Sequence, residues 1–125
     1  MDRTILLIER DLGYAFWLGR NLDHAGFQTF PARTVADAAS LLRELHLTVD
    51  ILMLDCQLPG AIEFVSTLRS SRKSFKMICL NGEVDHRCRR ETAAFCRKPV
   101  ELREHRRTEW AEEFREMLLC APDLH

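Results

Sequence analysis

Polar and charged residues that could act on a charged ligand follow several short apolar segments of this 125-residue chain. They are Glu9, Arg10, Asp11, Asp55, Gln57, Asn81 and Lys98. Carboxylates attract cations and a lysine attracts anionic groups, so these residue types suit chemistry on a charged ligand. They can act together only if the fold brings the ends of those apolar segments to one place.

The apolar segments predict strands that alternate with segments of helical period. The predicted strands are Thr4–Ile8, Phe27–Phe30, Val49–Leu54, Phe75–Leu80 and Phe95–Arg97. The first, third and fourth are nearly continuous apolar runs, as in strands buried on both faces of a sheet. We expect Pro31 to end the second strand.

Helical periodicity covers most of the intervening sequence. The predicted helices are Leu12–Ala25, Val35–Leu45, Ala61–Ser70 and Glu101–Leu119. Asp11 and Thr34 are suited to cap the first two. The segment 83–94 has little apolar periodicity, so the fourth of five expected helices should be short or missing. The alternation predicts an α/β fold with a parallel sheet, helices on both faces and ligands at the carboxyl ends of the strands.

Length and charge limit the classes of function. The chain is long enough for a single domain, residues 1–125, with its own core. Eighteen Lys and Arg against nineteen Asp and Glu give a net charge of −1, which argues against nucleic acid or an anionic membrane as a direct partner. No apolar run approaches the ~20 residues of a membrane span. We therefore expect a cytoplasmic protein.

The five cysteines are odd in number, scattered and without a CxxC pair. A disulfide framework is therefore not expected. Cys79 lies in an apolar run and is interpreted as a small buried hydrophobic residue. Cys56 lies beside Asp55, but nothing near it in the sequence would lower its pKa, so a redox role is not favoured.

Four motifs, in this order, resemble the receiver domains of two-component response regulators, of the chemotaxis-regulator type. They are ILLIERD at the first strand, DILMLDCQLPG around Asp55, MICLNG at the fourth strand, and FCRKPV around Lys98-Pro99. The resemblance runs from about Ile5 to Leu118. It implies a flavodoxin-like three-layer sandwich with a five-stranded parallel sheet in the order 2-1-3-4-5.

The resemblance also implies roles for individual residues in a phosphoryl switch. Asp55 matches the aspartate that accepts a phosphoryl group from a histidine kinase, and Lys98 matches the lysine that pairs with the phosphoryl oxygens. If a magnesium ion were bound, Glu9, Asp55 and the backbone carbonyl of Gln57 would hold it. Asn81 and Phe95 occupy the two switch positions. Asp11 could join the acidic pocket, but a helix cap is the favoured interpretation of this residue.

The chain departs from the family pattern at this pocket. Where receivers have two adjacent acids after the first strand, this sequence has Glu9-Arg10. Glu9 and Asp55 against Arg10 and Lys98 then give no net charge, so we expect no metal and a forked ion pair from Arg10 to Asp55. Asn81 replaces the usual switch hydroxyl, although its amide can still donate a hydrogen bond. The loop after Pro59 is also short.

These departures favour an atypical receiver: not an enzyme, but a protein-interaction module of phosphorelay signalling with weak or lost magnesium-dependent phosphorylation and no cofactor. The alternative is a working receiver that accepts a phosphoryl group on Asp55 and uses Mg²⁺. An α/β enzyme, such as a small-molecule phosphatase or a flavin protein, is disfavoured because neither GxGxxG nor GxxxxGK occurs.

The resemblance implies protein partners, such as a histidine kinase or an output domain. A homodimer is a further possibility. Trp110 and Phe114 lie four residues apart on one face of the last predicted helix and could form that contact. The alternative is that both rings pack on the sheet.

Overall fold

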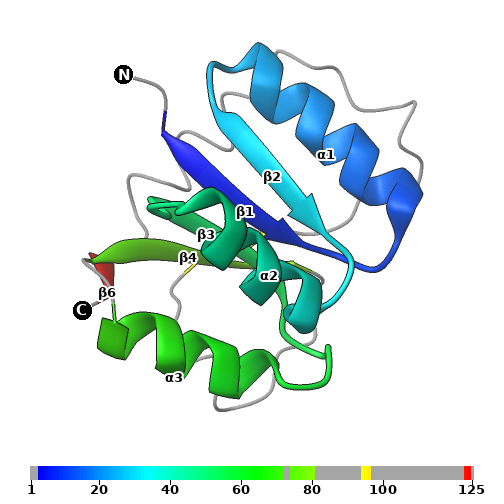
Figure 1. Ribbon diagram of the computed structural model, residues 1–125. Helices are drawn as coiled ribbons and strands as arrows, with labels where there is room; N and C mark the ends of the chain where they lie inside the picture. Colours follow the sequence, from blue (N-terminus) through cyan, green and yellow to red (C-terminus); the bar gives the residue numbers. More distant parts are fainter. Residues whose placement is uncertain (1–2, 72–73, 81–93, 97–122, 125) are drawn as a thin grey trace.

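The computed structural model describes residues 3–71, 74–80, 94–96 and 123–124. Its described elements form a sheet flanked by helices (Figure 1). The strands are β1 (Thr4–Ile8), β2 (Gln28–Ala32), β3 (Ile51–Asp55), β4 (Phe75–Leu80), β5 (Ala94–Cys96) and β6 (Asp123–Leu124). The helices are α1 (Leu12–His24), α2 (Val35–Leu45) and α3 (Ala61–Ser71). The predicted α/β alternation is confirmed over this part of the chain.

The first four strands are all parallel and lie in the order β2-β1-β3-β4, and β5 pairs parallel with β4. The register sets Ile8 opposite Leu54 and Leu54 opposite Cys79. Because all these strands run the same way, the polar residues that follow β1 and β3 lie at the same edge of the sheet.

Two details differ from the sequence expectation. Pro31 lies inside β2 instead of ending it, opposite Leu7. A proline has no N–H to donate and is tolerated in a strand at the edge of a sheet, which is the place of β2. The short strand β6 pairs antiparallel with Phe75 and Lys76, whereas β5 pairs with the last three residues of β4.

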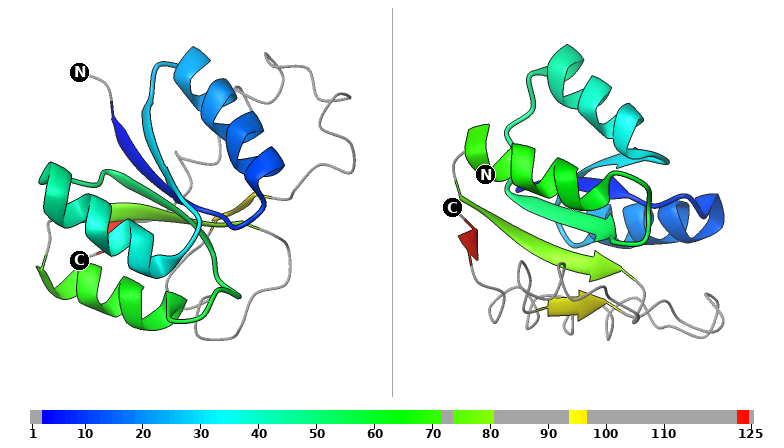
Figure 2. Two further views of the ribbon diagram at one scale, coloured as in Figure 1. Left: turned by 45° about the vertical axis from the view of Figure 1, so that its right-hand side comes forward. Right: turned by 90° about the horizontal axis from the view of Figure 1, so that it is seen from below.

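The core is divided into two layers by the alternation of side chains along the strands. Ile5, Leu7, Ile51 and Met53 pack with α1 on one face, whereas Leu6, Ile8, Leu52 and Leu54 pack with α2 and α3 on the other (Figure 2). All eight are fully buried. The sheet is therefore covered on both faces, which explains why these strands are continuously apolar in the sequence.

The helices begin at the predicted caps. The side chain of Asp11 accepts a hydrogen bond from the backbone N–H of Tyr14 at 3.2 Å, and Thr34 accepts one from Asp37 at 3.1 Å. Helix α2 ends at His46 in the left-handed conformation, with φ 49°. Asp11 and Thr34 each satisfy an N–H that the helix itself leaves without an acceptor.

The expected fourth and last helices, with Trp110 and Phe114, lie outside the described residues. In the part of the chain that the structure covers, no helix is long and apolar enough to cross a membrane.

Candidate functional site

Two acidic residues lie next to each other at the carboxyl ends of the central strands. Asp55 is the last residue of β3, and Glu9 follows β1 directly and donates its backbone N–H to the carbonyl of Ala32 at 3.0 Å. Since Ile8 pairs with Leu54, continuing the register by one residue places Glu9 beside Asp55, on strands about 4.8 Å apart. Both side chains are 2% exposed.

The Asp55 carboxylate also organises the loop that follows it. Its Oδ1 accepts a hydrogen bond from the backbone N–H of Gln57 at 3.1 Å, and its carbonyl accepts one from Leu58 at 3.1 Å. A turn of this kind keeps the backbone of Gln57 close to the carboxylate. The structure therefore brings together Asp55 and Gln57, two of the residues that the sequence predicted for the site.

Asp11 is the N-terminal cap of α1. Its Oδ1 caps the helix, and its backbone N–H donates to Oε1 of Glu9 at 3.1 Å. These bonds fix the loop between β1 and α1 through both acidic residues. The interpretation of Asp11 as a cap is confirmed.

Arg10 lies at the surface, with an exposed side chain. Across the described ranges, no ion pair joins Arg10 to Asp55. The forked pair expected from the sequence is thus not present. The physical reason is desolvation: bringing a guanidinium to a carboxylate that is 2% exposed would remove it from water, whereas at position 10 it stays hydrated.

Glu9 and Asp55 are two acidic side chains that could contribute to a magnesium site at this edge of the sheet. Among the residues that the structure describes, no group of three or more His, Cys, Asp or Glu side chains is placed to hold a metal ion. Glu9 and Asp55 supply two carboxylates, but the carboxylate of Asp11 is engaged by α1. A hard cation would therefore have to complete its shell with backbone carbonyls and water.

The other predicted site residues are only partly placed. The backbone of Phe95 lies in β5, opposite Cys79. Asn81 and Lys98 lie outside the described residues, so their roles remain predictions.

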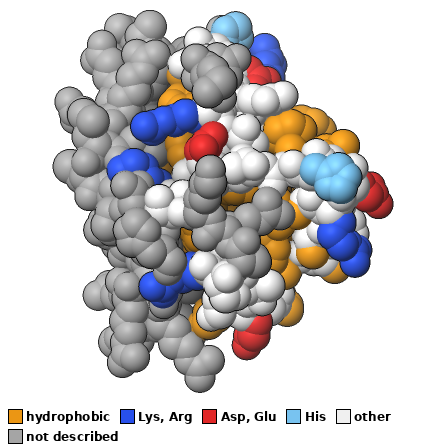
Figure 3. Space-filling model, turned by 60° about the vertical axis from the view of Figure 1, so that its left-hand side comes forward, with side chains coloured by type: hydrophobic (Ala, Val, Ile, Leu, Met, Phe, Trp, Pro, Cys, Tyr) orange, Lys and Arg blue, Asp and Glu red, His pale blue; other side chains and the backbone are white. Residues whose placement is uncertain are grey.

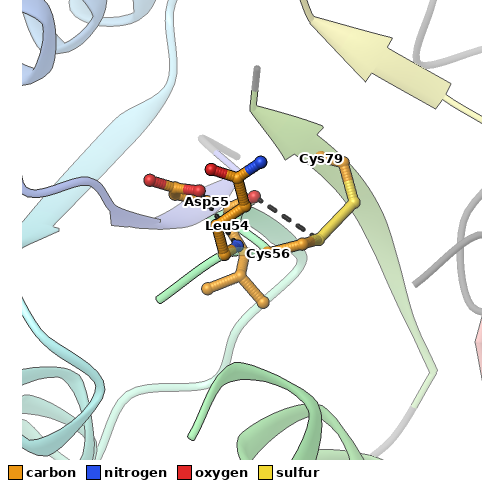
Figure 4. The surroundings of a disulfide bond; sticks show 5 residues. Leu54, Asp55, Cys56 and Cys79 are labelled. Atoms are coloured by element: carbon orange, nitrogen blue, oxygen red, sulfur yellow. Dashed lines mark hydrogen bonds between the residues drawn. A yellow bond between two sulfur atoms is a disulfide. The ribbon is translucent and has the colours of Figure 1, made fainter. Parts of the chain in front are cut away.

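A disulfide next to the site was not expected from the sequence. Cys56, which follows Asp55, is bonded to Cys79 of β4, and their Cα atoms are 6.2 Å apart (Figure 4). Cys79 is buried in the core, as the sequence predicted, but the expectation that it forms no disulfide is wrong. The cysteines are 23 residues apart, and only the register that places Cys79 opposite Leu54 brings their side chains together. No signal in the spacing of the cysteines could have revealed this pair.

No protein-family profile matches the chain. Among curated proteins it is similar to the photosynthetic apparatus regulatory protein RegA of Rhodobacter capsulatus, with 27% identity over 81 residues. That match covers 65% of this chain and 44% of RegA, so it spans less than half the length of this relative.

Solved structures of receiver domains share the fold. A receiver domain from Methylobacillus flagellatus has a TM-score of 0.70 at 17% identity, covering 94% of this chain and 99% of the other. A response regulator from Thermotoga maritima has a TM-score of 0.71 at 15% identity, covering 95% and 99%. For the chemotaxis protein CheY4 of Vibrio cholerae, the TM-score is 0.71 at 16% identity, with 94% and 99% covered. These similarities show that the chain has the α/β fold of CheY-like receiver domains.

Proposed function

We propose that this chain acts in two-component signalling as an atypical receiver, a protein-interaction module in which magnesium-dependent phosphorylation of Asp55 is weak or lost. The CheY-like fold and the similarity to RegA, a regulatory protein, support a role in two-component signalling. Its partners would be a histidine kinase, an output domain or a second copy of the chain.

Weak or lost phosphorylation is inferred from Asp11, whose carboxylate caps α1. Position 10 is an exposed arginine, and the neighbouring acid is held by the N–H of Tyr14 at the start of α1. Freeing Asp11 for a metal ion would cost the helix its cap, about 1 kcal/mol. Among the described residues, Glu9 and Asp55 then remain as candidate carboxylate ligands, and Arg10 places a positive charge next to Glu9 in the sequence.

The surface beside α1 suits a protein partner. Leu12 and Phe16 are 44% and 66% exposed, and they border a hollow of about 360 Å³ that Leu41 of α2 also lines. Exposed apolar side chains grouped around a hollow are typical of binding surfaces. Figure 3 shows acidic, basic and hydrophobic side chains intermixed among the described residues of one face of the molecule.

The second candidate is a working receiver, and the burial of Glu9 and Asp55 favours it. Two neighbouring carboxylates that are each 2% exposed are unfavourable unless hydrogen bonds or a cation compensate them. The backbone N–H of Asp11 donates to Oε1 of Glu9, and the backbone N–H of Gln57 donates to Oδ1 of Asp55. Lys98 would supply the positive charge in this candidate.

Phosphorylation of the full chain distinguishes the two candidates. The protein is incubated with acetyl phosphate, with and without Mg²⁺, and its intact mass is compared with that of Asp55→Asn treated in the same way. For the atypical receiver we expect no magnesium-dependent gain in mass over the control. Beryllofluoride provides a second test, with the emission of Trp17 and Trp110 as the readout; Trp17 stacks on the buried Tyr14 of α1.

Magnesium-dependent addition of one phosphoryl group per chain, absent from Asp55→Asn, would establish the working receiver instead. Phosphorylation that persists in Asp55→Asn would remove Asp55 from the site in both candidates.

A further inference from the structure

The Cys56–Cys79 disulfide lies at the base of the loop that carries the candidate site. Cys56 is the first residue after Asp55, and Cys79 is the next-to-last residue of β4. The bond therefore ties the β3–α3 loop covalently to a central strand. Figure 4 shows the Asp55 carboxylate and the disulfide extending from this strand end in different directions.

Neighbouring positions along the chain explain this arrangement. Asp55 pairs with Leu80, whose side chain belongs to the α1 face of the core, whereas Cys56 and Cys79 belong to the α2–α3 face. Cys56 thus joins the disulfide to Asp55 through the backbone, while its side chain belongs to the α2–α3 face. The disulfide can change how firmly the loop is held without occupying the space next to the carboxylate.

The surroundings of the two cysteines suit both oxidation states. Cys56 is 7% exposed and Cys79 is fully buried, among apolar side chains of the α2–α3 face. The Cys56 sulfur lies 3.8 Å from the carbonyl oxygen of Leu54, to which a reduced thiol can donate. A reduced cysteine otherwise behaves as a small apolar side chain, so opening the bond leaves no buried charge.

We propose that Cys56 and Cys79 form a reversible redox site: the disulfide holds the β3–α3 loop against β4, and reduction releases it. The proposal of a redox site stands on the geometry of the two cysteines. Its consequence for signalling rests on the proposed function, because the released loop includes the Asp55–Gln57 turn.

The reductant is a dithiol, either a small molecule or a protein. One of its thiolates attacks the Cys56 sulfur, the more exposed of the two, and the S–S bond breaks with the electron pair leaving on the Cys79 sulfur, which takes up a proton. The second thiolate then attacks the mixed disulfide and releases Cys56, which is protonated in turn. Two electrons and two protons pass from the dithiol to the protein, and the dithiol becomes a disulfide.

The experiment uses the full chain equilibrated with oxidised and reduced dithiothreitol in varied ratios. Alkylation of free thiols under denaturing conditions, followed by peptide mass mapping, identifies which cysteines are linked. We expect a Cys56–Cys79 link that forms in the oxidised buffer and disappears in the reduced one. Failure of this link to form in excess oxidised dithiothreitol, or its persistence in excess reduced dithiothreitol, would overturn the proposal.

Hydrogen exchange then tests the effect on the loop. We expect the amides of residues 56–60 to exchange at least about tenfold faster in the reduced protein, because the tether no longer opposes local opening. The amides of α2 should be unchanged and serve as the internal control. Equal exchange in the two states would reject a switch even where the disulfide forms.

Variants distinguish the loss of the Cys56–Cys79 bond from other effects of dithiothreitol on the protein. Cys79→Ala should show the fast loop exchange in both buffers, and Cys120→Ser, which keeps both bonded cysteines, should behave as the wild type. The comparison of oxidised and reduced wild type needs no variant and still decides the question if Cys79→Ala fails to fold. None of these measurements depends on phosphorylation. The proposal of a redox site can therefore be rejected while the proposed receiver function stands, and the receiver function can be rejected while the redox site stands.

Discussion

The ends of β1 and β3 lie side by side, but the loops that follow them are held in different ways. Three residues, 9–11, connect β1 to α1, and five residues, 56–60, connect β3 to α3. In the first loop, the side chains of Glu9 and Asp11 both accept backbone hydrogen bonds that start the helix. In the second, Asp55 bonds to Gln57, and a disulfide ties Cys56 to β4.

The position of each acid relative to the neighbouring strand and helix decides whether its carboxylate is available to a ligand. In the connection of three residues, Asp11 directly precedes α1, so its carboxylate serves as the helix cap. Asp55 is the last residue of β3, separated from α3 by the loop 56–60, so its carboxylate stays near the sheet edge. Asp11 therefore caps a helix, whereas Asp55 stays the candidate site residue, although both are acids at the carboxyl end of the sheet.

The largest expected effect concerns the covalent tether of the second loop. Reduction of the wild type, or Cys79→Ala, should lower the free energy of unfolding by about 3 kcal/mol, because the bond closes a segment of 23 residues in the unfolded chain. Urea denaturation of the oxidised and reduced protein measures the difference. Equal midpoints would mean that β4 and the loop are held by packing alone.

The next effect concerns charge at the first loop. Arg10→Asp should strengthen Mg²⁺ binding at least about tenfold, since it removes a positive charge and adds a carboxylate next to Glu9. Calorimetric titration of Mg²⁺ against both proteins measures this change. Arg10→Gln, which removes the charge without adding a ligand, should lie between them. Tight binding by the wild type, lost in Asp55→Asn, would contradict the proposed metal-poor site.

A smaller effect on stability tests whether Asp11 is a helix cap or a metal ligand. Asp11→Ala should lower the free energy of unfolding by about 1 kcal/mol, whereas Asp11→Asn should cost much less, because asparagine also caps helices. Thr34→Ala, at the cap of α2, is the matched control and should resemble Asp11→Ala. If Asp11→Asn instead abolished Mg²⁺ binding at unchanged stability, Asp11 would be a metal ligand and not only a cap.

The smallest effect on stability is expected at the surface of α1. Phe16 is 66% exposed, so Phe16→Ala should change the free energy of unfolding by less than about 0.5 kcal/mol. Phe64, which is 8% exposed, provides the contrast, and Phe64→Ala should cost about 3 kcal/mol. A large loss of stability in Phe16→Ala would show that this side chain supports the fold instead of presenting a surface to a partner.

The sequence by itself determined the alternation of strands and helices, the continuously apolar character of β1, β3 and β4, and the caps at Asp11 and Thr34. These features depend on residues close together in the chain, which is why periodicity and cap preference reveal them. The polar residues at the strand ends followed from the same local pattern. Their gathering at one edge followed from the parallel direction of the strands.

Only the tertiary structure decided that Arg10 stays at the surface and that Cys56 meets Cys79. The first depends on the desolvation of a guanidinium beside a buried carboxylate, which the order of residues does not reveal. The second depends on the register between β3 and β4, since a shift of one residue would turn Cys79 to the opposite face of the sheet. Contacts between segments distant in the sequence are fixed by packing, and the redox site proposed beside Asp55 is one of them.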